Sequence, residues 1–209
     1  MAHKFKQLLE KIAKEKAPGP APTFSILHLL RAMELGAEKP IGRTKLSAEL
    51  KIGQGAARTI ISRLREAGLI STSKMGYTLT TKGLKLLGEY RKIFQEKIKI
   101  GEYELINAKH NFAILAKNCG HKIRSGIEQR DAAVKIGAKG AVTIVLKNGR
   151  LTIPSVSENF ARDFPSAAKQ ILKLLQPEEN DVIIISGADT PNLAEQGTIA
   201  AAWTLFDDC

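Results

Sequence analysis

The sequence predicts an α+β protein with two domains, and three observations lead to this expectation. In the first half, apolar residues repeat with the period of helices. In the second half, apolar β-branched runs alternate with helical segments, which is typical of a sheet with helices packed on it. The excess of positive charge is confined to the first half: residues 1–99 hold 20 Lys and Arg against 8 acidic residues, whereas residues 100–209 hold 12 against 13. The two halves are therefore expected to meet different partners.

The overall charge narrows the class of partner. The formal net charge is +11 and the pI is about 9.7, a balance that favours a nucleic acid or an anionic membrane. Two cysteines, Cys119 and Cys209, provide no disulfide framework. The first sixteen residues are too charged for a signal peptide, and no apolar run reaches transmembrane length. We expect a soluble, cytoplasmic protein with no membrane partner.

The N-terminal residues 1–23 are expected to form a basic amphipathic helix and a stiff linker. Four apolar residues recur with helical spacing: Phe5, Leu8, Leu9 and Ile12. They predict a helix over 4–16 with a lysine-rich outer face. Such a helix can lie on a membrane, but its apolar face is small, so packing against the protein is favoured. The three prolines and one glycine of APGPAPT (17–23) interrupt the pattern.

Residues 24–98 follow a specific order of elements. Three helices are predicted over 24–35, 43–51 and 54–67, and the first and third of them end at Gly36 and Gly68. A hairpin with strands over 69–73 and 77–80 follows, and then a helix over 81–98. A helix pair joined by a tight turn, then a hairpin and a last helix, is the plan of a winged helix-turn-helix. EAGLI (66–70), the hairpin and TTKG (80–83) also resemble winged-helix transcription regulators, and this resemblance implies DNA binding.

The helix over 54–67 is the expected reading head. Ala57, Ile60, Ile61 and Leu64 share its apolar stripe, so its polar residues, Arg65 among them, point outward. Gln54 and Arg58 are the types that pair with adenine and guanine edges in the major groove. The same helix supplies three further predicted contacts: Thr59, Ser62 and Arg63.

Basic residues outside this helix are predicted to hold the DNA backbone. Arg43, Thr44 and Lys45 lie at the start of the preceding helix, where amides and a hydroxyl suit a phosphate, and Lys74 lies at the tip of the hairpin. The alternative is that these residues form a solvated surface. Few aromatic residues are present, which disfavours single-stranded RNA as the main ligand.

Residues 101–209 predict a second domain with the order ββαββαβα and a mixed sheet. Strands are expected over 102–108 and 111–117, followed by a helix over 126–136 that a Ser125–Glu128 capping box opens and Gly137 closes. A hairpin over 141–154 has Asn148-Gly149 at its tip, and a helix over 166–176 follows Pro165. The last elements are a buried strand over 182–186 and a helix over 191–206 capped by Thr190. The segments GIEQRDAAVKIGAKGAVTIVLKNGRL and DVIIISGADTPNLAEQG resemble an archaeal family of winged-helix proteins whose C-terminal domain has no known function.

A turn in this domain suggests a pocket for a small effector. SGADT (186–190) follows the buried strand and precedes a helix, and ligands of open α/β sheets favour such strand ends. The residues expected to line the pocket are Ser186, Gly187, Asp189 and Thr190. The alternative is a plain turn in which Thr190 caps the helix.

Other polar residues do not predict chemistry. His110, Cys119 and His121 lack the third or fourth ligand of a zinc site, and ion pairs along one helix explain Glu128, Arg130 and Asp131. Cofactor fingerprints and catalytic signatures are absent. We therefore expect no metal, no cofactor and no enzymatic activity.

Together these patterns predict a DNA-binding transcriptional regulator. Its winged helix is expected to bind duplex DNA, and its C-terminal domain to form a homodimer or to sense a small molecule, because such regulators bind two half-sites. Two alternatives stay open. The first is a winged-helix module that binds another protein, and the second is an enzyme tethered to nucleic acid, with its activity in the C-terminal domain.

Overall fold

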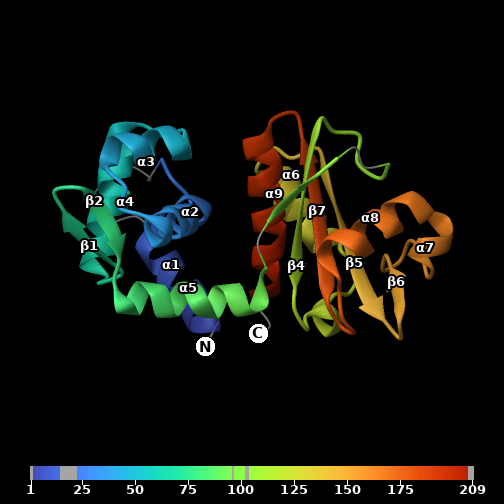
Figure 1. The fold of residues 1–209 in the computed structure, drawn as a ribbon. Helices are drawn as coiled ribbons and strands as arrows, with labels where there is room; N and C mark the ends of the chain where they lie inside the picture. Colours follow the sequence, from blue (N-terminus) through green and yellow to red (C-terminus); the bar gives the residue numbers. More distant parts are fainter. Residues whose placement is uncertain (1, 15–22, 96, 102–103, 207–209) are drawn as a thin grey trace. The chain divides into compact units, whose positions relative to one another are not determined.

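The computed structural model describes residues 2–14, 23–95, 97–101 and 104–206. It divides the chain into two compact units, residues 1–90 and 91–209 (Figure 1). The boundary falls within a helix, whereas the sequence predicted domains of 24–98 and 101–209. Most of the expected Pro-rich linker, residues 17–22, and Cys209 lie outside the described residues.

The first unit consists of helices and one hairpin. Its elements are α1 (Ala2–Ala13), α2 (Ile26–Glu38), α3 (Arg43–Leu50), α4 (Gln54–Glu66), β1 (Ile70–Ser73), β2 (Gly76–Leu79) and α5 (Thr81–Ile93). The strands pair in antiparallel fashion around a two-residue turn, Lys74-Met75. This order of elements is the one that the periodicity and turn residues predicted.

Two helix ends in this part of the chain differ from the prediction. Helix α2 continues through Gly36 to Glu38, and Gly36 lies against the ring of Tyr77, where a Cβ would come within 2.5 Å of Cε2. Helix α5 ends at Ile93 and not at Ile98. Its backbone leaves the helix to pair with another strand: the Gln95 N–H donates to Leu115 O, and Phe94 forms a bridge with Ala116. The end of α5 is therefore set by contacts with residues distant in the sequence.

The hairpin is anchored to α2 by a buried tyrosine. The Tyr77 hydroxyl donates to Ala32 O at 2.8 Å, and the side chain is 1% exposed. Burial raises the pKa of Tyr77, so the phenol remains a neutral donor. Tyr77 also exchanges two backbone hydrogen bonds with Ile41. These contacts orient the hairpin relative to the helices of the first unit.

The second unit is a five-stranded sheet with helices on both faces. Its elements are β3 (Ile98–Ile100), β4 (His110–Ala116), η1 (Gly120–Lys122), α6 (Ile127–Lys135), β5 (Gly140–Lys147), β6 (Arg150–Thr152), α7 (Phe160–Asp163), α8 (Pro165–Leu175), β7 (Val182–Ala188), α9 (Pro191–Trp203) and η2 (Thr204–Phe206). The strand order is β3-β4-β7-β5-β6. Helices α7 and α8 cover one face, and α6 and α9 cover the other (Figure 1).

Three expectations for this unit are corrected. The sheet is antiparallel at every pairing and not mixed. The first strand is β3, while the described residues 104–108 form a turn, a single bridge residue at Ile106 and a loop. The loop is held by Asn111, whose Nδ2 donates to Gly101 O and Ala108 O. Helix α6 begins after Gly126 without the predicted capping box: within the described part of the chain Ser125 Oγ accepts from the Ile127 N–H, at 3.4 Å, and not from Glu128.

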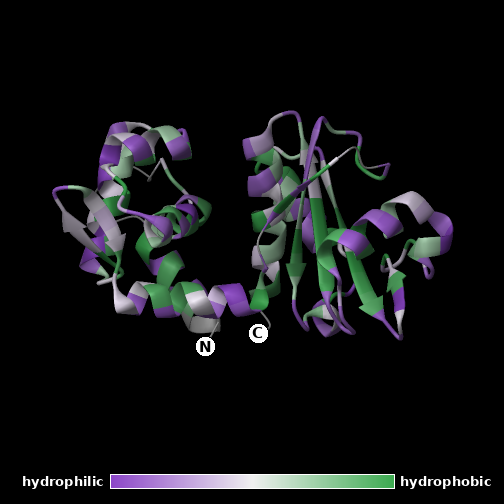
Figure 2. Ribbon diagram, in the orientation of Figure 1, coloured by the Kyte–Doolittle hydropathy of each residue, from purple (hydrophilic) through white to green (hydrophobic). Residues whose placement is uncertain are grey.

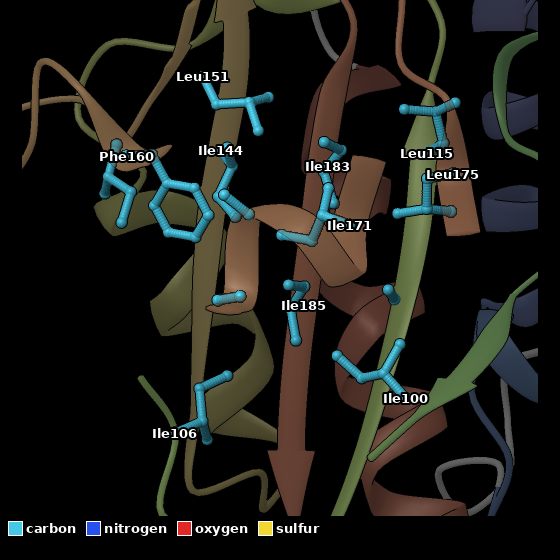
Figure 3. Packing of buried hydrophobic residues seen from close by; sticks show 14 residues of the cluster. Ile100, Ile106, Leu115, Ile144, Leu151, Phe160, Ile171, Leu175, Ile183 and Ile185 are labelled. Carbon is cyan, nitrogen blue, oxygen red and sulfur yellow. The ribbon is translucent and has the colours of Figure 1, made fainter. Parts of the chain in front are cut away.

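The core of the second unit lies between the sheet and α8. Strand β7 is buried along its whole length, and the central strands β4, β7 and β5 are the most apolar in hydropathy (Figure 2). Ile171 and Leu175 of α8 point at Ile183 and Leu115 (Figure 3). Each fully buried aliphatic side chain contributes roughly 1.5–3 kcal/mol. No helix of the described residues has the length and apolar character needed to cross a membrane.

Candidate nucleic-acid interface

Helix α4 presents a polar face to the surface of the first unit. Ala57, Ile60 and Leu64 are fully buried, while Ile61, predicted to share their stripe, is only half-buried. Gln54, Arg58 and Arg65 are exposed on one flank of the polar side. Within the described part of the chain, the side chains of these three residues form no hydrogen bond or ion pair. They are therefore available to an external partner.

The two hydroxyls of α4 that were predicted to contact DNA are engaged within the helix. Thr59 Oγ1 donates to Gly55 O at 3.0 Å, and Ser62 Oγ donates to Glu66 Oε1 at 3.0 Å. Both residues are half-buried. Their oxygens can still accept hydrogen bonds, but a phosphate oxygen is itself an acceptor and requires a donor. Each hydroxyl must give up its internal bond before it can donate to a phosphate.

Arg63 has a structural role that the sequence did not suggest. Its Nη1 donates to Ile12 O and to Lys14 O, both at 2.8 Å. Its guanidinium also lies 5.3 Å from the ring centroid of Phe24, in the range of a cation–π contact. Arg63 thus satisfies carbonyls at the C-terminal end of α1, and we do not count it among the residues that face DNA.

The start of α3 is a second basic surface. Gly42 precedes the helix and provides no side-chain cap, so the first amides of α3 lack the partner that helices usually find there. Arg43, Thr44 and Lys45 are all exposed. Because α3 packs against α4, the structure brings these residues and the polar face of α4 onto neighbouring helices.

The tip of the hairpin carries Lys74 and Met75. Both are exposed, and Met75 is 79% exposed. The turn is fixed by Ser73, whose Oγ accepts from the Met75 N–H at 3.2 Å. Lys74 has no partner in the residues that the structure describes. The sequence identified Lys74 but not the adjacent Met75, whose exposure only the turn geometry shows.

The four residues predicted to bind an effector do not share a pocket. Ser186 is completely buried, and its Oγ donates to Gly140 O. Gly187 lies against the side chains of Ile106, Ala108 and Asn111, with no room for a Cβ. Thr190 caps α9 by accepting from the Leu193 N–H.

The fourth residue, Asp189, is exposed and forms an ion pair with Lys139 at 2.6 Å. The hydrogen bond from Lys139 lowers the pKa of Asp189. The turn therefore has the structural role that was the alternative to a pocket.

An open cleft lies beside this turn. Its volume is about 730 Å³, and polar residues line it together with small apolar ones: Glu104, Ile106, Asn107, Ala108, Lys109, Lys139, Ser166, Ala167 and Gln170. None of the four predicted residues is part of this lining. The sequence did not reveal the cleft, because its walls come from three separate segments of the chain.

Metal-binding residues are not clustered in the described residues. Cys119 is buried and its Sγ donates to Lys117 O, whereas His121 Nδ1 lies 3.2 Å from Asn180 Nδ2. No group of three His, Cys, Asp or Glu side chains in the described ranges is arranged to hold a metal ion.

Comparisons with known proteins match each unit separately. Residues 28–85 match the family model of a PH0730-like N-terminal domain, and residues 106–205 match that of a domain of unknown function, DUF4443. Among solved structures, the hypothetical protein PH0730 from Pyrococcus horikoshii OT3 is similar. It is 29% identical, the match covers 88% of this chain and 94% of that chain, and the TM-score is 0.69. No curated protein matches the chain. The chain is thus similar in fold to an archaeal hypothetical protein over most of its length.

Proposed function

We propose that this protein is a transcriptional regulator whose first unit binds duplex DNA as a winged helix-turn-helix. One observation carries the proposal: the polar face of α4 holds Gln54, Arg58 and Arg65 exposed and without side-chain partners in the described residues. Arg and Gln side chains on an exposed helix are suited to guanine and adenine edges in the major groove. In this arrangement α4 enters the groove.

The surrounding basic residues support the same orientation. Arg43, Thr44 and Lys45 lie at the uncapped start of the neighbouring helix α3, where amides and cations favour a phosphate. Lys74 projects from the tip of the hairpin. A helix in the groove with cations on flanking elements is how helix-turn-helix proteins position themselves on the duplex.

The proposal extends to the second unit, which we infer to form a homodimer or to bind a small effector. The open cleft near Lys139 and Asp189 supports the effector, since concave sites with a few polar groups are the usual ligand sites of proteins. Dimerisation would allow two copies of α4 to bind two half-sites.

Fluorescence anisotropy tests the central claim. Labelled random-sequence duplex DNA is titrated with the full-length protein at 50 mM and 200 mM salt, with double-stranded RNA in parallel. If the basic surface neutralises about six phosphates, affinity falls roughly 10³-fold between the two salt concentrations. No binding at 50 mM salt, or equal binding to the RNA duplex, contradicts the proposal. A tight protein partner in place of DNA would then favour the protein-binding module.

A further inference from the structure

Helix α1 is an integral part of the first unit. Phe5 and Leu9 are fully buried and Ile12 is 8% exposed. The rings of Phe5 and Tyr90 lie 6.0 Å apart between centroids, and α1 also packs on α2. The sequence placed this segment outside the 24–98 domain and favoured its packing against the protein; in the structure the first unit covers its apolar face.

Arg63 ties the end of α1 to α4. Successive residues of a helix are rotated by about 100°, which places Arg63 on a flank of α4, next to the buried stripe and not among Gln54, Arg58 and Arg65. Arg63 reaches from this flank to the carbonyls of Ile12 and Lys14. The end of α1 is thus held alongside the helix that we propose to enter the major groove (Figure 1).

The end of α1 carries two unpaired cations. Lys11 and Lys14 are exposed, and neither has a side-chain partner in the described residues. Lys6 differs, because it lies 3.9 Å from Glu10. Lys14 directly follows α1 and comes one helical turn after Lys11 in the sequence, so the two cations lie close together at this end of the helix.

We infer that α1 is a second DNA-binding element, in which Lys11 and Lys14 bind phosphates of the backbone that borders the groove occupied by α4. A helix in the major groove has a phosphate backbone on either side, and a cationic element on its flank meets one of them. Arg63 is a positioning residue, since it acts on the DNA through the placement of α1. The inference rests on the proposed function, because it requires that the first unit binds duplex DNA.

The salt dependence of binding tests this inference. The double variant Lys11→Ala/Lys14→Ala removes two phosphate contacts, and each contact contributes about 0.9 to the slope of log K against log salt. From 50 mM to 200 mM salt, this variant is expected to lose about 12-fold less affinity than the unmodified protein. The double variant Lys135→Ala/Lys147→Ala is the matched control, because it removes the same charge from exposed lysines of the second unit.

The outcomes separate the inference from the proposed function. If the unmodified protein binds duplex DNA but the α1 variant keeps its full salt slope, the inference is wrong and the proposed function stands. If the unmodified protein does not bind duplex DNA, both fail. A slope reduced equally by the α1 variant and by the control also overturns the inference, because the effect is then one of net charge alone.

A third variant tests the role of Arg63. Arg63→Ala is expected to reduce the salt slope to the level of the α1 double variant. Combining all three substitutions should then add no further reduction, because residues that act through one another are not additive. A further reduction of about 0.9 in the triple variant would show that Arg63 itself contacts a phosphate, and would overturn its assignment as a positioning residue. Circular dichroism of each variant monitors its folding.

Discussion

Polar side chains are used differently in the two units. In the first unit, Arg58 and Arg65 are exposed on α4 and have no partner in the described residues. In the second unit, Asp181 is almost fully buried and accepts from Lys117 Nζ and from the amides of Asn118 and Glu178. A charged group that accepts several hydrogen bonds stabilises its own fold, whereas one without internal partners is available to a ligand.

Acidic residues of the second unit also fix its turns. The carboxylate of Glu179 accepts from the amides of Asn148 and Gly149 at the tip of the β5-β6 hairpin, and these bonds lower the pKa of Glu179. In the first unit, cationic side chains bind the backbone instead: Arg63 and Lys82 donate to carbonyls at helix ends. The comparison therefore predicts that changes to the buried groups of the second unit affect stability, whereas changes to Arg58 and Arg65 of α4 affect binding.

The largest expected effect is on the core of the second unit. Ile183→Ala leaves a cavity beside α8 and should lower the free energy of unfolding by about 2–5 kcal/mol. Urea denaturation followed by the fluorescence of Trp203, the single tryptophan, reports on this unit. Leu172→Ala, at a position 45% exposed on α8, is the matched control and should change stability far less. Equal losses in the two variants would contradict the packing described here.

Arg58→Ala should affect binding and leave stability unchanged. If Arg58 contacts a guanine, the loss on a selected DNA site is about 1–3 kcal/mol. The measurement is anisotropy on a site obtained by selection from random duplexes, with Lys135→Ala as the control. Affinity within twofold of the unmodified protein would mean that Arg58 only solvates α4, and the comparison between the units would lose its main support.

Tyr77→Phe tests the attachment of the hairpin to α2. The variant loses the hydrogen bond to Ala32 O, and a typical buried hydrogen bond contributes about 1 kcal/mol. The free energy of unfolding, followed by hydrogen exchange of amides in α2 and α4, should fall by this amount. Unchanged exchange in these helices would show that the other contacts of the ring are sufficient to hold the hairpin.

The smallest effect concerns pH and His28. Burial lowers the pKa of His28 below its ordinary value of 6.5, and its Nδ1 accepts from the Ser25 N–H at 3.0 Å. As the pH falls, His28 binds a proton in the unfolded chain before it does so in the folded protein. The stability contributed by neutral His28 is therefore complete above pH 6.5 and is lost as the pH falls through the folded pKa.

The measurement is hydrogen exchange in the first unit between pH 7.5 and 5.5, where the unmodified protein should lose stability that His28→Gln keeps. In the second unit, the lowered pKa of Glu179 changes stability only at pH values below its ordinary pKa of 4.5, which lie outside this range. A decline of the same size in the His28→Gln variant would assign the pH dependence to other groups.

Several elements were predictable because their signals are local. Asn148 and Gly149 both have positive φ, as their sequence in a tight hairpin suggests. Pro165 begins α8, and Thr190 caps α9. The apolar spacing of Ala57, Ile60 and Leu64 correctly gave the buried side of α4. Each of these signals depends on residues within one or two turns of the chain.

Elements whose ends depend on distant partners were not predictable. Helix α5 has an apolar pattern that extends beyond Ile93, but Phe94 pairs with Ala116 and ends the helix. The antiparallel order of the sheet depends on which strands meet β7, and strand periodicity carries no information about neighbours. Arg63 was assigned to DNA because composition and helical position cannot show a contact with carbonyls 49–51 residues away.

By itself, the sequence determined most of the helices and strands, which sides of them are apolar, and that the excess of positive charge lies in the first half of the chain. Periodicity and turn chemistry act over a few residues, so they can be seen without the fold. Only the tertiary structure decided which basic side chains of the described residues are left without partners, that Arg63 of α4 binds the end of α1, and where the second unit is hollowed. These properties arise when distant segments compete for the same hydrogen bonds and the same space, and that competition is settled only by packing.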